Sequence, residues 1–358
     1  MSLARSSAFS LVALAALAPT SGAEVRWRNV PAQTAEWHRT PEAWTLAETL
    51  LRFQHPSGGW SKNTDWTQPI DAKTAPALTR DGDFETSATI DNGATVGELR
   101  FLAKLIAARG DERCRAAFLR GFDYLLAAQY DNGGWPQFFP LRPGYYARVT
   151  YNDDAMIGVM TLLREAGDGG FPFVDAERRQ RARTAVAKGL DCILRSQVLV
   201  NGKRTAWCAQ HDEKTLAPAW ARSYEPPSLS ANESVGIVRF LMTAGASDAV
   251  ASAIVDAVAW LEAVPLHGVR VETTLKSDGS RDRTLVSDDA APPLWARFYE
   301  IGSNKPIFMG RDSVPREYNE IEIERRLGYA YLGVWPATLL QKEYPQWLAA
   351  RTAKPGER

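Results

Sequence analysis

Three segments of the chain place apolar residues at helical spacing behind a short polar start. They are residues 91–102 (DNGATVGELRFL), 152–163 (NDDAMIGVMTLL) and 231–241 (ANESVGIVRFL), which align on Gly97, Gly158 and Gly236. In the first segment, Val96 and Leu99 begin a series of apolar positions on one helix face. We therefore predict a helix in each segment. The polar residues are expected to act as N-caps, and close helix packing is expected to compensate for the glycine.

A second repeated unit precedes these segments. Residues 50–63 (LLRFQHPSGGWSKN), 125–138 (LLAAQYDNGGWPQF) and, more loosely, 193–207 (ILRSQVLVNGKRTAW) end a helix-like run with Gln54, Gln129 and Gln197 and continue to a tryptophan. A repeat that holds two helices indicates stacked or ring-closed helical hairpins. Strand-like alternation is scarce, apart from a possible β excursion near residues 268–287.

The connections between these predicted helices differ in length. The connections that follow the helices with polar starts are short. Those from Gln54 to Asp91, Gln129 to Asp153 and Gln197 to Asn232 are long. If the hairpins close into a ring, all the long loops meet on one rim, and long loops on a rigid scaffold are common places for function. That rim would collect Lys62, Asp91, Asn92, Arg148, Asp153, Asp154, Arg222 and Glu225.

Composition and the first residues narrow the class of protein. The 358 residues carry 42 basic and 42 acidic side chains, and this balance argues against nucleic acid as a partner. Residues 1–23, with Arg5, an apolar run and a small-residue end at Ala23, have the pattern of a signal peptide. No later segment is apolar enough to span a membrane. We expect a secreted or periplasmic protein with one domain over residues 24–358. Its three cysteines allow at most one disulfide and do not indicate which pair.

Acidic residues at two of the predicted helix starts are candidate metal ligands. Asp91 stands in TIDNGAT, and Asp153 and Asp154 stand in YNDDAM. Each of them alone is better explained as an N-cap. Together on one rim they would offer the hard oxygen ligands that Ca²⁺ prefers, in a shell completed by water or by an anionic ligand. The four histidines show no spacing typical of zinc ligands.

Basic residues accompany these acids. Lys62, Arg222, Arg297 and Arg311 each lie in a polar or aromatic motif, and WARSYE at 220–225 is echoed by WARFYE at 295–300. Any one of these cations could be an ordinary surface residue. Several of them beside a bound cation make sense only around an anionic ligand, such as a carboxylate or a phosphate. The sequence contains no P-loop and no G-x-S-x-G nucleophile elbow.

Seven motifs, in order, resemble those of the family 10 pectate lyases. They are GGWSKN, TIDNGAT, NGGWPQFFP, YNDDAM, WARSYEPPSLS, RFYEI and YLGVWP, and they extend from residue 58 to residue 336. The resemblance implies an all-α fold, an (α/α)₃ toroid of helical hairpins. It also implies secretion, Ca²⁺ dependence and β-elimination of polygalacturonate. Residues 265–290 are the part of the chain that the resemblance covers least well.

The resemblance also implies roles for individual residues. Asp91 and Asp153 match calcium-binding aspartates, with Asn92 and Asp154 as their neighbours. Arg222 matches a catalytic arginine that acts as the base, while Arg297 and Arg311 match substrate-binding arginines. Lys62 lies in a shared motif, where we expect a contact with substrate. We expect the enzyme to act as a monomer.

The chemistry explains why such a site combines acids and bases. Elimination removes the C5 proton next to a uronate carboxylate and expels the C4 oxygen, so the carboxylate's negative charge must be neutralised. An arginine is a poor base because it stays protonated at ordinary pH. Two roles for Arg222 therefore remain open: base on C5, or carboxylate clamp with Lys62 as the base.

Three other functions fit parts of the pattern. An inverting glycoside hydrolase on a similar toroid would use two separated carboxyl groups, for which Asp153 and Glu225 are candidates. A non-catalytic protein that binds acidic polysaccharide could use the same rim. A terpene-cyclase-like toroid is suggested by the Gln…Gly–Trp repeats, but the sequence lacks an aspartate-rich acid motif, and a basic rim does not suit that chemistry.

Overall fold

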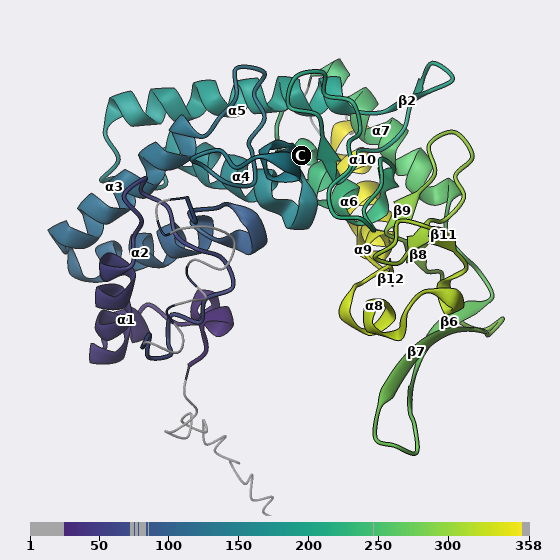
Figure 1. The fold of residues 1–358 in the computed structure, drawn as a ribbon. Coiled ribbons are helices and arrows are strands. Elements are labelled where there is room, and N and C mark those ends of the chain that lie inside the picture. The colour runs from purple at the N-terminus through teal and green to yellow at the C-terminus, as the bar shows by residue number, and fades with distance from the viewer. Residues whose placement is uncertain are drawn as a thin grey trace, which may run out of the picture.

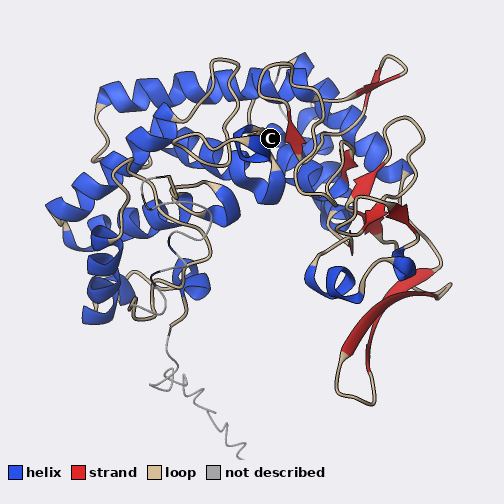
Figure 2. Cartoon of the chain, viewed as in Figure 1, coloured by secondary structure: helices blue, strands red, loops and turns tan. Residues whose placement is uncertain are grey.

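The fold is built mainly from helices (Figures 1 and 2). The computed structural model describes residues 25–71, 75, 78, 84, 86–245 and 247–352, so the predicted signal peptide lies outside the described residues. Seven helices form the main body: α1 (Pro41–Arg52), α2 (Val96–Arg109), α3 (Glu112–Ala127), α4 (Ala155–Gly167), α5 (Ala176–Ser196), α6 (Ala231–Met242) and α7 (Asp248–Ala263). Shorter helices follow: α8 (Ile323–Gly328), α9 (Pro336–Thr338), a π-helical turn (Leu339–Glu343) and α10 (Tyr344–Thr352).

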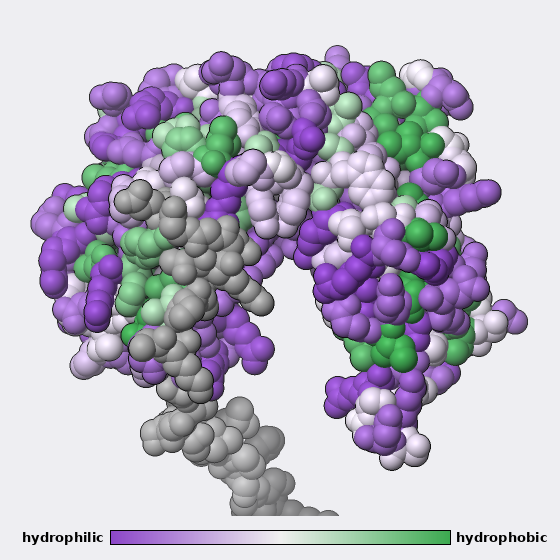
Figure 3. Space-filling model, viewed as in Figure 1, coloured by the Kyte–Doolittle hydropathy of each residue, from purple (hydrophilic) through white to green (hydrophobic). Residues whose placement is uncertain are grey.

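These helices lie in two layers. The hairpins α2/α3, α4/α5 and α6/α7 each place one helix in an inner layer, where α2, α4, α6 and α9 pack in succession. The outer layer consists of α1, α3, α5 and α7, which also pack in succession. The predicted all-α toroid of helical hairpins is confirmed. Figure 1 shows that the helices follow an arch, and Figure 3 shows an opening between its two flanks.

Strands are short and occur only as antiparallel pairs in the described ranges. The pairs are β1 (Val149–Thr150) with β4 (Gln210–His211), β2 (Leu199–Val200) with β3 (Lys203–Arg204), β5 (Leu229–Ser230) with β9 (Phe298–Tyr299), β8 (Trp295–Ala296) with β12 (Leu332–Gly333), β10 (Phe308–Met309) with β11 (Pro315–Arg316), and β6 (Val269–Leu275) with β7 (Arg281–Ser287). The last pair is a projecting hairpin (Figure 2), which confirms the β excursion predicted near residues 268–287.

The repeated glutamine joins each loop to the next outer helix. The Gln54 amide Nε2 donates to the carbonyl oxygens of Gly58, in its own loop, and Ala117, in α3, at 2.7 and 2.8 Å. Gln129 bonds in the same way to Gly133 and Ala185, and Gln197 to Thr205 and Ala253, each at 2.9 Å. One side chain thus satisfies two carbonyls in each repeat, and this explains the recurrence of glutamine.

The repeated tryptophan fixes the return of the chain toward the inner layer. The indole Nε1 atoms of Trp60, Trp135, Trp207 and Trp295 donate to the carbonyl oxygens of Leu50, Leu125, Ile193 and Leu261 at 2.7–2.9 Å. Four buried indoles therefore occupy equivalent places, one more than the three copies that the sequence pattern indicated. The fourth copy lacks the glutamine, because Pro265 stands four residues after Leu261 where the other copies have Gln.

The three cysteines do not form a disulfide. Cys114, Cys192 and Cys208 are all buried and all carry free thiols. Among the helices of the described residues, none is both long enough and apolar enough to cross a membrane.

Candidate functional site

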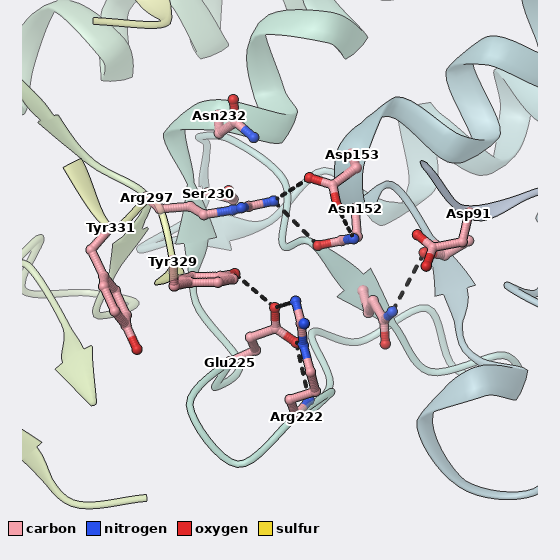
Figure 4. A network of polar contacts seen from close by, with 12 residues as sticks. Asp91, Asn152, Asp153, Arg222, Glu225, Ser230, Asn232, Arg297, Tyr329 and Tyr331 are labelled. Atoms are coloured by element: carbon pink, nitrogen blue, oxygen red, sulfur yellow. Dashed lines mark hydrogen bonds and ion pairs between the residues drawn. The ribbon is translucent and has the colours of Figure 1, made fainter. Parts of the chain in front are cut away.

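Backbone hydrogen bonds bring the starts of the three inner helices onto one rim. The backbone amides of Thr89, Thr150 and Ser230 donate to the carbonyls of Trp60, Trp135 and Trp207. The next amide in each segment donates to a carbonyl of the following repeat, that of the residue two places after the tryptophan of that repeat. Asp91, Asn152 and Asn232 come next and so occupy equivalent places in successive repeats. The turn at Asp91–Gly93 packs against the turn at Asn152–Asp154, and that turn packs against α6. The predicted convergence of the long loops is therefore observed (Figure 4).

The inner helices do not begin with side-chain caps, so the N-cap prediction is wrong. The residues that precede α2, α4 and α6 are Thr95, Asp154 and Ser230. None of these side chains accepts a hydrogen bond from its own helix. Asn92 and Asp153 have φ of 53° and 51°, and Thr95 and Asp154 are also left-handed. Residues other than glycine pay a conformational penalty in this region. These turns direct the side chains away from the helix ends, so that Asp153 reaches Arg297 and Asp154 reaches Gly236 in α6.

Asp91 is paired on one side and unpaired on the other. Its Oδ2 lies 2.9 Å from the Lys62 ammonium, which also packs over the Phe138 ring at 5.2 Å. Its Oδ1 is buried and has no hydrogen-bond partner among the described residues. A buried carboxylate oxygen left without a donor is costly, and a bound cation would satisfy it.

Asp153 lies at the open end of a buried charge cluster. Its Oδ1 accepts a hydrogen bond from Arg297 Nη2 at 2.9 Å, and its Oδ2 accepts one from the side-chain amide of Asn152 at 2.8 Å. The same Arg297 nitrogen also contacts Asn152 Oδ1 and the buried carboxylate of Glu233. The Asp153 side chain is 38% exposed, whereas that of Arg297 is only 6% exposed. Burial acts to lower the pKa of Arg297, but the charges of Glu233 and Asp153 outweigh it and raise that pKa well above its usual value.

Asp154 points at the neighbouring inner helix. A Cβ atom added to Gly236 in α6 would lie 1.8 Å from Asp154 Oδ1, so the carboxylate fills the space that this glycine leaves. Burial, followed by the charges of Glu233 and Asp153, raises the pKa of Asp154 to about 6. At Gly97 and Gly158 an added Cβ would meet only ordinary contacts, at 3.7 and 3.9 Å. Close helix packing is therefore the wrong explanation for those two glycines.

The oxygen donors fit a calcium ion only partly by themselves. The unpartnered oxygen of Asp91 and the exposed carboxylate of Asp153 are suitable ligands. In the described part of the chain, no group of three or more His, Cys, Asp or Glu side chains is arranged to hold a metal ion. A cation at this rim would therefore need water or substrate oxygens as well. The assignment of Asp91, Asp153 and Asp154 as calcium ligands stays a prediction.

Arg222 is held by a carboxylate from its own loop. Its Nε and Nη2 atoms donate to Glu225 Oε2 and Oε1 at 2.8 and 2.5 Å, and its backbone amide donates to Oε2 at 3.1 Å. The Arg222 side chain is 40% exposed, while that of Glu225 is 5% exposed. Burial acts to lower the pKa of Arg222, but the hydrogen bonds and charge of Glu225 raise it above its usual value. The guanidinium is thus a firmly held cation at the cleft edge.

Two predicted substrate-binding residues lie farther out. Asn92 is exposed, and its amide Nδ2 donates to Asn63 Oδ1 at 2.8 Å. Arg311 pairs with the exposed Glu324 at 3.0 Å and lies over the Tyr224 ring at 5.9 Å. The stacking on Tyr224 places Arg311 beside Arg222, whose guanidinium packs over the same ring at 5.0 Å.

Sequence reasoning missed several residues of this site. Asn152 contacts Arg297, and Tyr329 contacts Glu225 (Figure 4). Glu233 also contacts Arg297. The alignment on Gly97 and Gly158 places Asn152 in register with Asp91, since each lies six residues before its glycine. An alignment on the tryptophans would have paired Lys62 with Arg297, because each lies two residues after its tryptophan. No local pattern marks Tyr329.

The chain is similar to known lyases in both sequence and structure. The model of the pectic acid lyase family matches residues 54–340. The structure of a family 10 polysaccharide lyase from Cellvibrio cellulosa is 32% identical, with a TM-score of 0.75, and the match covers 89% of this chain and 94% of that one. A mutant of a family 10 polysaccharide lyase from the same organism, in complex with trigalacturonic acid, is 31% identical with the same TM-score, and the match covers 89% and 95%. The comparison with curated proteins gives no match. The family match and the two structures together show that this chain is an enzyme of the pectic acid lyase family.

Proposed function

We propose that this chain is a secreted pectate lyase that cleaves α-1,4-linked polygalacturonate by calcium-assisted β-elimination and releases 4,5-unsaturated oligogalacturonides. The observation that carries the proposal is the alternation of charge on one rim. Two aspartates, one with an unpartnered buried oxygen, lie between Lys62, Arg297 and Arg222. A polymer with one carboxylate per sugar needs cations along its path, and a bridging cation needs carboxylates opposite.

The solved relative supports the choice of substrate. The Cellvibrio cellulosa mutant was crystallised with trigalacturonic acid, a short piece of polygalacturonate. With 31% identity over 89% of this chain, we infer that the rim binds the same kind of acidic sugar. Arg311 and Asn92 are proposed as contacts for sugars beyond the reacting one, because both lie at exposed positions around the central cluster.

Asp91 and Asp153 are the proposed calcium ligands, with Asp154 as an inner support. When bound, Ca²⁺ neutralises a uronate carboxylate and so makes the neighbouring C5–H more acidic. Arg297 balances the charge of Asp153 from the buried side. Asn152 orients the same carboxylate through its amide, which leaves the exposed side of Asp153 toward the cleft.

Arg222 is proposed as the residue that faces C5 of the reacting sugar. Its partly exposed side chain and its place in the WARSYE loop agree with the base implied by the family resemblance. The raised pKa of Arg222 instead favours a permanently charged clamp, with Lys62 as the base. The first role predicts a loss of kcat on removal of Arg222, and the second predicts a loss confined to KM.

The hydrolase alternative has less support. A glycosidase acid needs a raised pKa, yet Arg222 and Tyr329 outweigh the effect of burial and hold the pKa of Glu225 below its usual range. Asp153 is occupied by Arg297 and Asn152. Neither carboxyl group is set up as a proton donor.

The direct test is an ultraviolet assay on polygalacturonate. Elimination creates a conjugated double bond that absorbs in the near ultraviolet, whereas hydrolysis creates only reducing ends. We expect absorbance to rise with calcium present and to stop after addition of EDTA. Reducing ends without absorbance would favour a hydrolase, and binding without either product would favour a non-catalytic polysaccharide-binding protein. Secretion is tested separately, by the N-terminal sequence of the exported protein, which we expect to begin after Ala23.

A further inference from the structure

Tyr329 lies at the centre of the arginine cluster. It follows α8, is buried, and its hydroxyl donates to Glu225 Oε1 at 2.7 Å. The guanidinium groups of Arg222 and Arg297 both pack over its ring, at 5.4 and 5.0 Å from the centroid. Figure 4 shows the tyrosine between the two arginines, with its hydroxyl directed at Glu225. The Tyr329 side chain therefore contacts both the Arg222–Glu225 pair and Arg297.

The hydroxyl completes the set of hydrogen bonds around Glu225. Oε2 accepts from the amide and Nε of Arg222, and Oε1 accepts from Arg222 Nη2 and from Tyr329. Because both oxygens are engaged in a buried position, the carboxylate cannot rotate without losing a charge-assisted hydrogen bond. The tyrosine is the only one of these donors that comes from outside the 222–225 loop.

This arrangement also determines which edge of Arg222 is available. Nε and Nη2 face Glu225, and in the described part of the chain Nη1 forms no hydrogen bond. The ring faces of Tyr224 and Tyr329 confine the guanidinium plane, at 5.0 and 5.4 Å. Nη1 is thus the nitrogen of the guanidinium that remains available to a ligand.

We propose that Tyr329 is a positioning residue for the lyase reaction. Through its hydroxyl it fixes the Glu225 carboxylate, which in turn fixes Arg222 so that Nη1 faces the substrate. This inference rests on the proposed function for its kinetic consequence, but not for the positioning itself. The shared ring further ties the placement of Arg222 to that of Arg297, and so to Asp153.

Tyr329→Phe separates the hydroxyl from the ring. The phenylalanine keeps the packing against both guanidinium groups and removes only the hydrogen bond to Glu225. Tyr331→Phe is a matched control, because Tyr331 is also buried, packs on Tyr329 at 4.8 Å, and donates its hydroxyl to the Met309 carbonyl at 2.5 Å rather than to Glu225. Thermal unfolding of both variants shows whether each is folded.

Two measurements follow. For Tyr329→Phe we expect kcat on polygalacturonate to fall about 10- to 100-fold with little change in KM, the range for loss of a hydrogen bond to a charged group. Tyr331→Phe should keep kcat within about twofold of wild type. In ¹⁵N NMR, the Arg222 Nε–H signal, assigned by its loss in Arg222→Lys, should be sharp in wild type and Tyr331→Phe and broadened or shifted in Tyr329→Phe.

The outcomes separate the two proposals. An Arg222 signal unchanged in Tyr329→Phe, or equal losses of kcat in both phenylalanine variants, would overturn the positioning role. If wild-type protein gives no unsaturated product, the proposed function fails. The NMR comparison then still decides whether Tyr329 orders Arg222.

Discussion

The two ends of the helical hairpins use the same residue types in different ways. The outer helices α1, α3, α5 and α7 are preceded by Thr40, Asp111, Asp175 and Ser247. Each of these four side chains accepts a hydrogen bond from an amide of its own helix. The inner helices α2, α4 and α6 are preceded by Thr95, Asp154 and Ser230, none of which caps its helix.

This contrast shows where side-chain chemistry serves stability and where it serves the cleft. A side-chain cap is worth about 1 kcal/mol to a helix, so three uncapped starts on one rim forgo a readily available stabilisation. At that rim the polar groups bond to residues distant in the sequence instead, as Asp91 does with Lys62 and Asp153 with Arg297. Left-handed turns at four positions make this redirection possible.

The largest expected effect is the difference between two arginines that each donate hydrogen bonds from Nε and Nη2 to a carboxylate. Arg222→Ala should lower kcat about 10²- to 10⁴-fold, the range for loss of a positioned proton-transfer group, with a much smaller change in KM. Arg178 in α5 is the matched control, because its Nε and Nη2 grip Asp123 on the outer layer at 3.0 and 2.6 Å. Arg178→Ala should leave kcat unchanged. Equal kinetic losses in both variants would remove the distinction between the two layers.

A smaller effect is expected from the glycines of the inner helices. Gly236→Ala places a Cβ against Asp154, and relief of this overlap should cost about 1–3 kcal/mol of unfolding free energy. Gly158→Ala meets only Val96, at 3.9 Å, and should stabilise its helix by up to about 1 kcal/mol. Urea unfolding of the two variants measures both values. A Gly236→Ala protein as stable as wild type would show that Asp154 does not need that space.

Glu98, a buried residue in the first turn of α2, gives a pH-dependent effect. Burial raises the pKa of Glu98 to about 7, although Trp66 Nε1 donates to its Oε1 at 2.7 Å. Because the folded pKa exceeds the unfolded one, ionisation of Glu98 destabilises the fold as pH rises from about 4.5 through 7. Glu98→Gln should therefore raise the free energy of unfolding by about 1–3 kcal/mol at pH 8 and leave it nearly unchanged at pH 4.5. An equal effect at both pH values would contradict the assignment.

The sequence allowed much of the fold to be predicted because its repeats are regular. The glutamine and tryptophan of each repeat make the same bonds each time, so their recurrence indicates the hairpins directly. The β hairpin followed from the alternation in residues 268–287. The fourth tryptophan repeat escaped notice because Pro265 replaces the glutamine and the β6–β7 hairpin separates it from Trp295.

The site was harder to predict, since its key contacts join distant segments. The motifs WARSYE and WARFYE look alike in the sequence, but their arginines are held by different partners. Only Arg222 pairs with the glutamate of its own motif, whereas Arg297 is held by Glu233 and Asp153. The N-cap interpretation failed because a polar residue at a helix start predicts a cap only when no better partner lies nearby. In this protein those partners are distant in the sequence, as Lys62 is from Asp91 and Arg297 from Asp153, and local patterns do not reveal them.

The central claim is that the aspartates of the inner rim are reserved for a cation and its uronate ligand. The most direct measurement is the rate of double-bond formation on polygalacturonate as a function of calcium concentration, for wild type, Asp91→Asn and Asp111→Asn. The two variants make the same chemical change, and asparagine caps the outer helix α3 as well as aspartate does. We predict that Asp111→Asn follows the wild-type curve and that Asp91→Asn needs at least about tenfold more calcium for half-maximal rate, the loss expected when a charged ligand becomes neutral. Superimposable curves for wild type and Asp91→Asn would contradict the account.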